Sequence, residues 1–323
     1  MIDYSATEPA RYRKAVVLCC DQNFLKFATF VVSQIYDLHP NADFDVCICA
    51  SEPLDLPATL DALPVRLCEI PLPDILADAP QSYRINLSSY LRLFVPTAFA
   101  KDYDRILYLD SDILLRGGDL SKLLDIDLLA GHPIAAVRTS HQRDNQLKLM
   151  PEFKSLGLTP APYFNAGILV IDVARWLESD VLAKSIELME TRPDVLNMHD
   201  QSVLNIVLRD TWSELSVVWN WMYSGRFSYL LESFDPFILH FAGRIKPWNK
   251  PNGEFPPKYP NAYRAFFTIH YPDEAAKMPA PASILAVPKF HKKSLLKQWW
   301  DFNGLARYIG RFGDPYVVID PRR

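Results

Sequence analysis

The first 140 residues alternate between short apolar runs and longer segments with a helical pattern. Lys14–Cys20 and Phe44–Ala50 are rich in β-branched and apolar residues and predict strands. Phe24–Leu38 carries apolar residues at helical spacing. Val65–Ile70 and Asp104–Leu109 predict two further strands. This alternation favours an α/β fold with a mostly parallel sheet and helices on both faces.

Polar residues follow two of the predicted strands at the points where these strands end. Asp21 and Asn23 come directly after the first strand, and Asp110 and Asp112 follow the run Asp104–Leu109. Because open α/β sheets bind ligands at the carboxyl ends of their strands, we expect both groups at one edge of the sheet. The sequence has neither a G-x-G-x-x-G nor a Walker-type loop, which disfavours a dinucleotide or P-loop site.

The aspartate pair has a spacing that can bring two carboxylates to one point. Asp110 and Asp112 are two positions apart, and side chains at that spacing lie on the same side of an extended backbone. Two ionised carboxylates repel each other unless a cation lies between them, and their oxygens suit hard divalent ions that bridge to phosphates. A strand end with two solvated aspartates fits the same letters, so the pair alone leaves both interpretations open.

A second polar segment, His240–Trp248, adds residue types that complement the pair. A neutral imidazole at His240 beside two carboxylates favours Mn²⁺, with Mg²⁺ as the second choice. Lys246 offers a point charge for a diphosphate, and Gly243 permits close approach of the backbone to a phosphate. Taken singly, His240 is more often a core histidine at a strand end and Lys246 a solvated surface charge.

Composition disfavours several other classes of protein. A net charge of −4 gives no electrostatic case for nucleic-acid binding. The five cysteines lie in apolar runs without a C-x-x-C pair, which argues against zinc and for buried thiols in a reducing compartment. No apolar stretch approaches the roughly 18 residues of a membrane span, and no signal peptide is evident. We expect a cytoplasmic protein, either free or peripheral on the inner face of the plasma membrane.

The composition changes near residue 250, where proline begins to cluster. We predict one folded domain over residues 1–250 and, over 251–323, a proline-rich connection with a basic amphipathic tail. Within the tail, Lys289–Trp300 combines four lysines with aromatic and aliphatic residues at helical spacing. Such a pattern is typical of a segment that lies on an anionic membrane surface. Packing of the same aromatics on the folded domain is the alternative.

Six short motifs occur in order along the chain: Cys20–Phe24 (CDQNF), Ser89–Leu93 (SYLRL), Leu107–Asp112 (LYLDSD), Tyr163–Gly167 (YFNAG), His199–Gln201 (HDQ) and His240–Trp248 (HFAGRIKPW). Together they resemble the family 8 retaining glycosyltransferases of the GT-A fold. The resemblance is closest to bacterial α-galactosyltransferases and α-glucosyltransferases that extend lipopolysaccharide or lipooligosaccharide cores. It spans roughly residues 14–250.

The resemblance implies a GT-A fold, with a Rossmann-like, mostly parallel mixed sheet flanked by helices and a nucleotide-sugar site in residues 1–250. It implies these roles: Asp110, Asp112 and His240 as metal ligands; Asp21, Asn23 and Phe24 against the nucleotide, with Ser111 near the ribose; Arg92 toward the donor sugar or diphosphate; Gly243 and Lys246 on the diphosphate; Asn165, Asp200 and Gln201 around the transferred sugar. The family often has tyrosine where this chain has Phe24, so stacking is kept but a hydroxyl is lost. Outside the family, Asn165 also fits a turn, Asp200 a helix N-cap and Gln201 a surface helix residue.

From the resemblance we expect a metal-dependent retaining glycosyltransferase that moves galactose or glucose from a UDP-sugar to a saccharide acceptor, with a lipopolysaccharide-type, lipid-linked glycan as the expected acceptor. Same-face attack is favoured over double displacement, because Gln201 is a poor nucleophile and Asp200 is the one other candidate nearby. One alternative is a sugar-phosphate nucleotidyltransferase, which usually has a glycine-rich, basic loop after its first strand. The other is a non-catalytic scaffold protein that binds sugar nucleotides.

Overall fold

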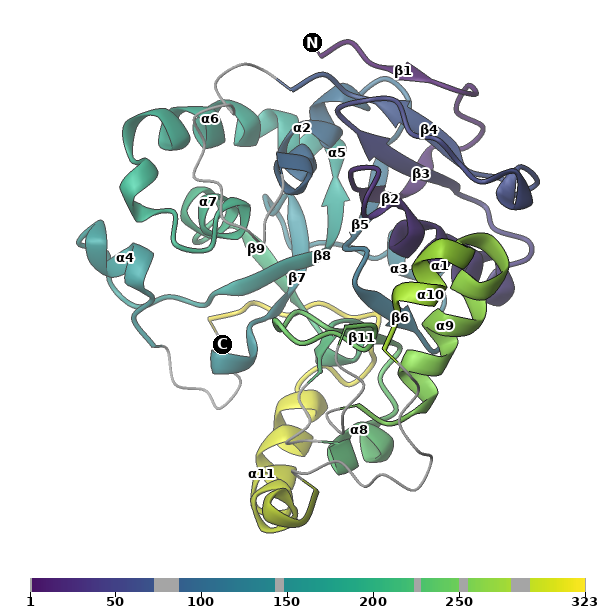
Figure 1. Ribbon diagram of the computed structural model, residues 1–323. Helices are drawn as coiled ribbons and strands as arrows, with labels where there is room; N and C mark the ends of the chain where they lie inside the picture. Colours follow the sequence, from purple (N-terminus) through teal and green to yellow (C-terminus); the bar gives the residue numbers. More distant parts are fainter. Residues whose placement is uncertain are drawn as a thin grey trace.

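The computed structural model describes residues 2–72, 87–142, 148–223, 228–249, 255–279 and 291–322. At its centre is an eight-stranded sheet with the order β1-β4-β3-β2-β5-β8-β7-β9 (Figure 1). Its strands are β1 (Ser5–Ala6), β2 (Lys14–Cys19), β3 (Asp45–Ala50), β4 (Arg66–Glu69), β5 (Arg105–Leu109), β7 (Ile134–Arg138), β8 (Phe164–Asp172) and β9 (Trp212–Leu215). Strands β4, β3, β2 and β5 are parallel, and β8 runs antiparallel between β5 and β7. The predicted mixed, mostly parallel α/β sheet is confirmed.

Both faces of the central strands are buried, which explains their nearly continuous apolar sequences. Alternate residues of β2 belong to different cores, with Val16 and Leu18 on one side of the sheet and Val17 on the other. The first core packs against α1 (Leu25–Leu38), and the second against α2 (Leu91–Ala98) and α6 (Val181–Thr191).

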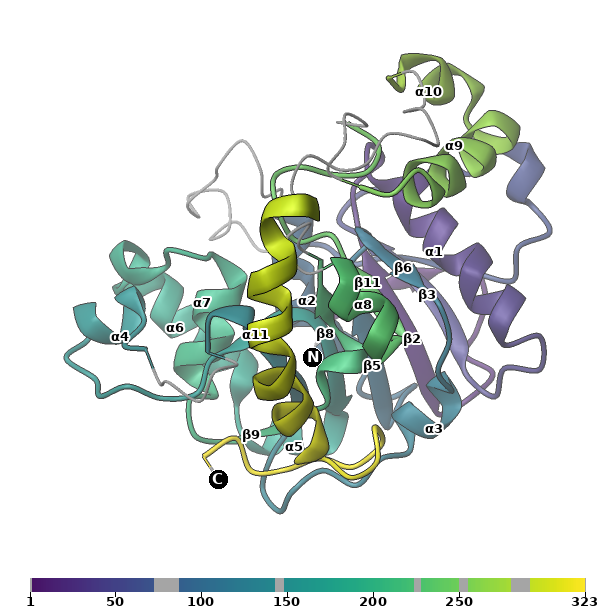
Figure 2. The same cartoon turned by 90° about the horizontal axis from the view of Figure 1, so that it is seen from below.

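The described residues form eight further α-helices (Figures 1 and 2). They are α3 (Leu120–Leu124), α4 (Pro151–Ser155), α5 (Val173–Glu178), α7 (Asp200–Val207), α8 (Ser228–Phe234), α9 (Lys258–His270), α10 (Pro272–Lys277) and α11 (His291–Gly310). None of the helices described is long and apolar enough to cross a membrane.

A small second sheet determines the position of His240, the first residue of the polar segment His240–Trp248. It has the order β10-β11-β6, with β6 (Ile113–Leu115), β10 (Trp221–Met222) and β11 (Ile238–His240). Strand β6 follows β5 after three residues, and it pairs antiparallel with β11. This pairing joins residues that are more than 120 positions apart in the sequence.

The described residues after 255 pack on the same core as α1. Tyr263 of α9 stacks against Phe30 of α1, and Tyr308 and Phe312 are buried near the end of the chain. The final residues return to the main sheet, where Ile319 pairs with Glu214. The boundary at residue 250 stays a prediction, as does the tail: Lys289 and the side chains up to residue 297 lie outside the described residues. All five cysteines are buried free thiols, as predicted.

Candidate metal centre

Asp110, Asp112 and His240 meet where the two sheets adjoin. The two aspartates lie in the link between β5 and β6, and His240 is the last residue of β11, opposite Ile113. His240 Nε2 is 3.1 Å from Asp112 Oδ1 and 3.6 Å from Asp110 Oδ2. One ligand atom from each of the three residues lies within 4.8 Å of the other two. The three side chains that the resemblance implies as metal ligands are therefore brought together by the fold.

The charge around Asp112 is fixed by its neighbours. Lys246 Nζ lies 2.5 Å from Asp112 Oδ2, and it also donates to the Phe241 carbonyl. Burial acts to raise the pKa of Asp112, but the charge of Lys246 beside it outweighs this effect and holds the pKa well below its usual value. Asp112 Oδ1 is nevertheless buried without a hydrogen-bond partner. An ionised, orphaned oxygen beside an imidazole nitrogen fits a divalent cation.

Gly167 of β8 lies directly behind two of these side chains. A Cβ at this position would come within 2.5 Å of Asp110 Oδ2 and 2.4 Å of His240 Cε1. The Gly167 carbonyl also accepts the backbone N–H of Asp110 at 2.8 Å. Only glycine lets β8 approach the cluster this closely. In contrast, a Cβ on Gly243 would meet no atom within 4 Å among the described residues.

Arg92 is buried and links two carboxylates. Its guanidinium lies 2.9 Å from Asp110 Oδ1 and 2.9 Å from Asp200 Oδ2, and it donates to the Ala166 carbonyl at 2.6 Å. It also lies over the ring of Tyr108, at 4.5 Å from the ring centroid. Burial raises the pKa of Asp200 even though the charge of Arg92 opposes this effect. The arginine that the resemblance directs toward the donor is thus also the counter-ion of both carboxylates.

Asn165 and Gln201 form one hydrogen-bonded pair. Asn165 Nδ2 donates to Gln201 Oε1 at 2.9 Å, and the same oxygen accepts the backbone N–H of Ala166 at 3.1 Å. Asp200 and Gln201 are the first two residues of α7. The preceding residue, His199, has a positive φ of 52°, a conformation that side chains rarely adopt and that is often found at functional sites. The N-cap residue is His199, without a side-chain cap hydrogen bond, so Asp200 is not the N-cap.

Asn220 connects this pair to His240. Its Nδ2 donates to Asn165 Oδ1 at 2.8 Å, and its Oδ1 lies 3.0 Å from His240 Nδ1. Asn220 is fully buried. Sequence reasoning missed this residue because it lies between Trp219 and Trp221, in a segment that reads as aromatic core. No motif singles it out.

Asp21, Asn23 and Phe24 occupy the turn between β2 and α1. Strand β2 pairs with β5 up to Leu18 and Leu109, so this turn and the aspartate pair leave the sheet at the same edge, as expected. Asp21 Oδ1 accepts the Phe24 N–H at 2.8 Å, which gives Asp21 a structural role within the turn. The Phe24 ring is 43% exposed. An exposed ring at this edge is available to stack on a base.

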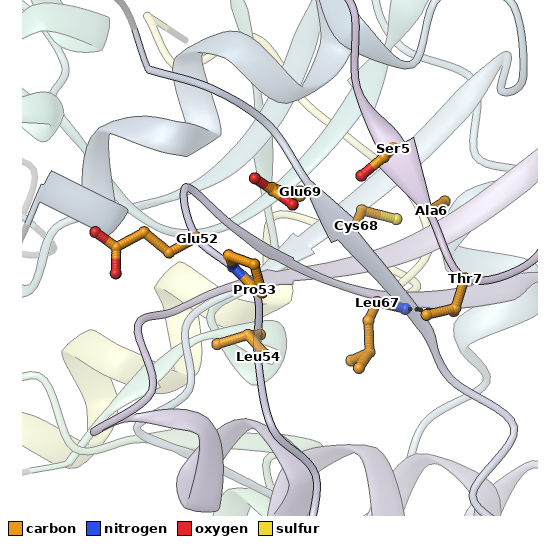
Figure 3. A pocket seen from close by; sticks show the side chains of 9 residues that line it. All are labelled: Ser5, Ala6, Thr7, Glu52, Pro53, Leu54, Leu67, Cys68 and Glu69. Carbon is orange, nitrogen blue, oxygen red and sulfur yellow. Dashed lines mark hydrogen bonds between the residues drawn. The ribbon is translucent and has the colours of Figure 1, made fainter.

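Ser111 lies between the two aspartates, and its buried hydroxyl makes no hydrogen bond among the described residues. A hollow of about 250 Å³ lies elsewhere, at the outer edge of the main sheet, between β1, β4 and the segment 52–54 (Figure 3). None of the predicted site residues lines it. The candidate site is therefore the cluster at the β5–β6 link, with Ser111 as an additional unpaired polar group.

Comparisons with known proteins bear on the family and the fold. The family model described as glycosyl transferase family 8 matches residues 15–251. Among curated proteins, the glycosyltransferase GlyF of Streptococcus pneumoniae is 31% identical over 73% of this chain and 58% of its own length. The lipopolysaccharide 1,2-glucosyltransferase of Escherichia coli is 24% identical over 50% of this chain and 49% of its own. The chain thus spans about two thirds or less of the length of the curated relatives it matches.

A solved structure of the galactosyltransferase LgtC, in complex with donor and acceptor sugar analogues, matches with a TM-score of 0.63. It is 21% identical, and the match covers 87% of this chain and all of the other. The glycosyltransferase GlyE of Streptococcus pneumoniae matches with a TM-score of 0.55 at 20% identity, over 83% of this chain and 63% of the other. At these identities the structural matches establish the fold.

Proposed function

This chain belongs to glycosyl transferase family 8, and from that premise we propose that it transfers galactose or glucose from a UDP-sugar to a saccharide acceptor, with retention at the anomeric carbon. Asp110, Asp112 and His240 would hold a divalent cation, with Mn²⁺ favoured over Mg²⁺ because the ligand set mixes nitrogen and oxygen. The observation that carries the proposal is the orphaned Asp112 Oδ1 beside His240 Nε2.

The residues around the cluster fit a sugar-nucleotide diphosphate. When bound, the cation would act as a Lewis acid that neutralises charge on the departing UDP. Lys246, which contacts Asp112, would add a second positive charge on the leaving group. Asp21, Asn23 and Phe24 would face the uracil and Ser111 the ribose, with Gly243 beside the diphosphate.

Neither nearby side chain is suited to act as a nucleophile. Asp200 is buried and paired with Arg92, and Gln201 Oε1 already accepts two hydrogen bonds. We therefore favour attack by the acceptor hydroxyl on the face from which UDP departs. The new glycosidic bond forms as the bond to phosphate breaks, and the proton of the hydroxyl passes to the departing phosphate. Asn165 and Gln201 would orient the transferred sugar. A sugar trapped covalently on Asp200 or Gln201 during turnover would overturn this mechanism.

The proposed acceptor is a lipopolysaccharide-type glycan. Its support is that two relatives, from Escherichia coli and Salmonella typhimurium, are a lipopolysaccharide 1,2-glucosyltransferase and a 1,3-galactosyltransferase. The proposal keeps both UDP-galactose and UDP-glucose as donors, since these relatives include a galactosyltransferase and a glucosyltransferase.

An acceptor that is linked to lipid would be reached at a membrane surface. In α11, Trp299 and Trp300 are 72% and 79% exposed, while Gln298 next to them is buried against Leu230 of α8. The helix therefore turns these aromatics away from the contact that anchors it. Together with the lysines of Lys289–Trp300, this supports binding to an anionic bilayer.

Substitution tests the membrane proposal better than truncation, because removal of residues after 285 would take Tyr308 and Phe312 from the core. We expect a Trp299→Ser, Trp300→Ser variant to bind phosphatidylglycerol vesicles more weakly than the parent chain. Ile269→Ser is the matched control, since Ile269 of α9 is also 66% exposed. Equal loss in both variants, or none in either, would contradict the proposal.

The transferase proposal is tested by calorimetric titration of UDP with and without Mn²⁺, followed by UDP release from a panel of UDP-sugars. We expect UDP to bind more tightly with Mn²⁺ and one hexose donor to release UDP. Release of pyrophosphate from a nucleoside triphosphate and a sugar phosphate would indicate a nucleotidyltransferase, which the family match disfavours. Binding of UDP-sugars without turnover on any saccharide acceptor would indicate a scaffold protein.

A further inference from the structure

Strand β8 changes register beside the metal centre. Its pairing with β7 shifts between Ala136 and Val137, and the β8 residues at this irregularity include Ala166 and Gly167. Their backbone N–H groups donate to side chains, Ala166 to Gln201 Oε1 and Gly167 to Asn165 Oδ1, both at 3.1 Å. Irregularities of this kind are common next to active sites because they release backbone groups from the sheet.

These two N–H groups fix the orientation of both side-chain amides. A backbone N–H can only donate, so the atom that faces it must be the amide oxygen. Asn165 Oδ1 is therefore directed at Gly167, and Asn165 Nδ2 is left to donate to Gln201 Oε1. The two assignments agree with each other, since Gln201 Oε1 is fixed independently by Ala166.

The orientation of Asn165 determines that of Asn220. Asn165 Oδ1 accepts from Asn220 Nδ2 at 2.8 Å, so the other end of the Asn220 amide, Oδ1, must face His240 Nδ1 at 3.0 Å. An oxygen at that position requires the imidazole to carry its proton on Nδ1. Asn220 and His240 are 0% and 3% exposed, so bulk water offers no competing partner.

We propose that Asn220, itself oriented by Asn165, is a positioning residue that holds neutral His240 in the Nδ1–H tautomer and leaves the Nε2 lone pair directed at the two aspartates. The opposite tautomer would place a proton on Nε2, against Asp112 Oδ1 at 3.1 Å. The carboxylates favour that tautomer when no cation is bound, and the proton would occupy the cation's coordination position. Asn220 opposes it with a buried hydrogen bond. The inference rests on the proposed metal site.

The first test measures the tautomer directly in the metal-free parent chain. The protein has seven histidines, and ¹⁵N spectra of the ring nitrogens distinguish the two neutral tautomers. The signal of His240 is assigned by its loss in His240→Gln. We expect the proton on Nδ1. A proton found on Nε2 would overturn the proposal without any further variant, so the test holds even if the Asn220 variants fail to fold.

The second test removes Asn220 Oδ1, the hydrogen-bond acceptor of His240 Nδ1. In Asn220→Ala we expect a mixture of tautomers and Mn²⁺ binding weakened about 10- to 100-fold, measured by calorimetry with the metal alone. Asn220→Asp keeps an oxygen at His240 Nδ1, so its tautomer should remain that of the parent. Gln142→Ala is the control, because Gln142 is also a fully buried amide but is bonded to Tyr163 and to backbone carbonyls elsewhere.

The outcomes separate this inference from the proposed function. An unchanged tautomer and unchanged Mn²⁺ affinity in Asn220→Ala contradict the positioning role. An equal change in Gln142→Ala also contradicts it, because the effect would then be general loosening of the core. If the parent chain binds no Mn²⁺ at all, the proposed metal site fails, while the tautomer spectrum still decides whether Asn220 orients His240.

Discussion

Two buried arginines bind carboxylates in this molecule, and the clusters around them are built differently. Arg138 at the end of β7 binds Glu214 of β9 through two hydrogen bonds of 2.8 and 2.7 Å. Glu214 also accepts from the Tyr308 hydroxyl, and Arg138 donates to the Pro321 carbonyl. No polar side-chain atom of this pair is buried without a partner. Arg92 likewise binds Asp110 and Asp200, but Asp112 Oδ1, in the cluster that Asp110 shares with His240, is left without a hydrogen bond.

The difference separates a structural ion pair from a binding site. Around Arg138 the side chains and backbone of the chain itself saturate both charges, and the partners come from the last residues, so the pair fastens the end of the chain to the sheet. Around Arg92 there are more carboxylates than cationic side chains. Arg92 and Lys246 contact three carboxylates, those of Asp110, Asp112 and Asp200. Buried charge is costly unless it is paired, so an unpaired carboxylate oxygen that lies beside a second carboxylate and an imidazole fits a bound cation.

The largest effect is expected at the cluster of Asp110, Asp112 and His240. Asp112→Asn removes one cation ligand and the charge that Lys246 contacts. UDP release from the donor sugar should fall on the order of 10³-fold or more, about 4 kcal/mol, as expected when charge stabilisation of a leaving group is lost. The melting temperature measured without metal should change little, since Lys246 is partly exposed and can turn to solvent. Full activity of this variant with Mn²⁺ would show that Asp112 is not a metal ligand.

For the Arg138–Glu214 pair we expect the opposite result, a loss of stability without a loss of activity. Arg138→Met leaves Glu214 as a buried charge without its main partner, and we expect a loss of about 3–5 kcal/mol in the free energy of unfolding. Activity per folded molecule should be unchanged. The double variant Arg138→Met, Glu214→Leu should recover most of the loss, because no buried carboxylate remains and Arg311, the other cation near Glu214, is partly exposed. Denaturant unfolding followed by fluorescence measures both. Lack of recovery in the double variant would mean that the pair contributes through the specific hydrogen bonds to Tyr308 and Pro321.

A smaller effect is expected where the backbone makes room for the metal ligands. In Gly167→Ala the new methyl would overlap Asp110 Oδ2 and His240 Cε1, so both side chains must move by several tenths of an ångström. We expect UDP release to fall about 10- to 100-fold, with weaker Mn²⁺ binding. Gly117→Ala is the matched control, because a Cβ there meets only Phe237 Cδ1 at 3.9 Å, an ordinary contact. Equal activity in both variants would show that the cluster tolerates displacement.

The sequence carried enough information for the parts of the molecule that depend on local pattern. Alternating apolar runs predicted β2 to β5, and the i, i+2 spacing predicted that Asp110 and Asp112 face one point. His240 was grouped with them by residue type and by the family resemblance; no local pattern predicted its position, which depends on the pairing of β6 with β11. Asn220 and Gly167 were not assigned roles. Hydrogen bonding between distant segments and the space behind a side chain leave no periodic trace in a single sequence.

The smallest effect is expected for an ion pair at the surface, which completes the contrast with the two buried clusters. Glu274 of α10 lies 2.5 Å from Lys26 of α1 and from Lys277, and these lysines lower the pKa of Glu274. A lowered folded pKa means that the pair contributes stability above the unfolded pKa of about 4.3 and loses it as the pH falls through the folded value. Because the Glu274 side chain is 31% exposed and screened by solvent, we expect Glu274→Gln to cost about 0.5 kcal/mol or less at pH 7. Chemical unfolding at pH 7 and again at pH 3 checks the sign: the difference between the two proteins should disappear at pH 3. A difference that persists at pH 3 would show that Glu274 acts by packing or hydrogen bonding, with no contribution from its charge.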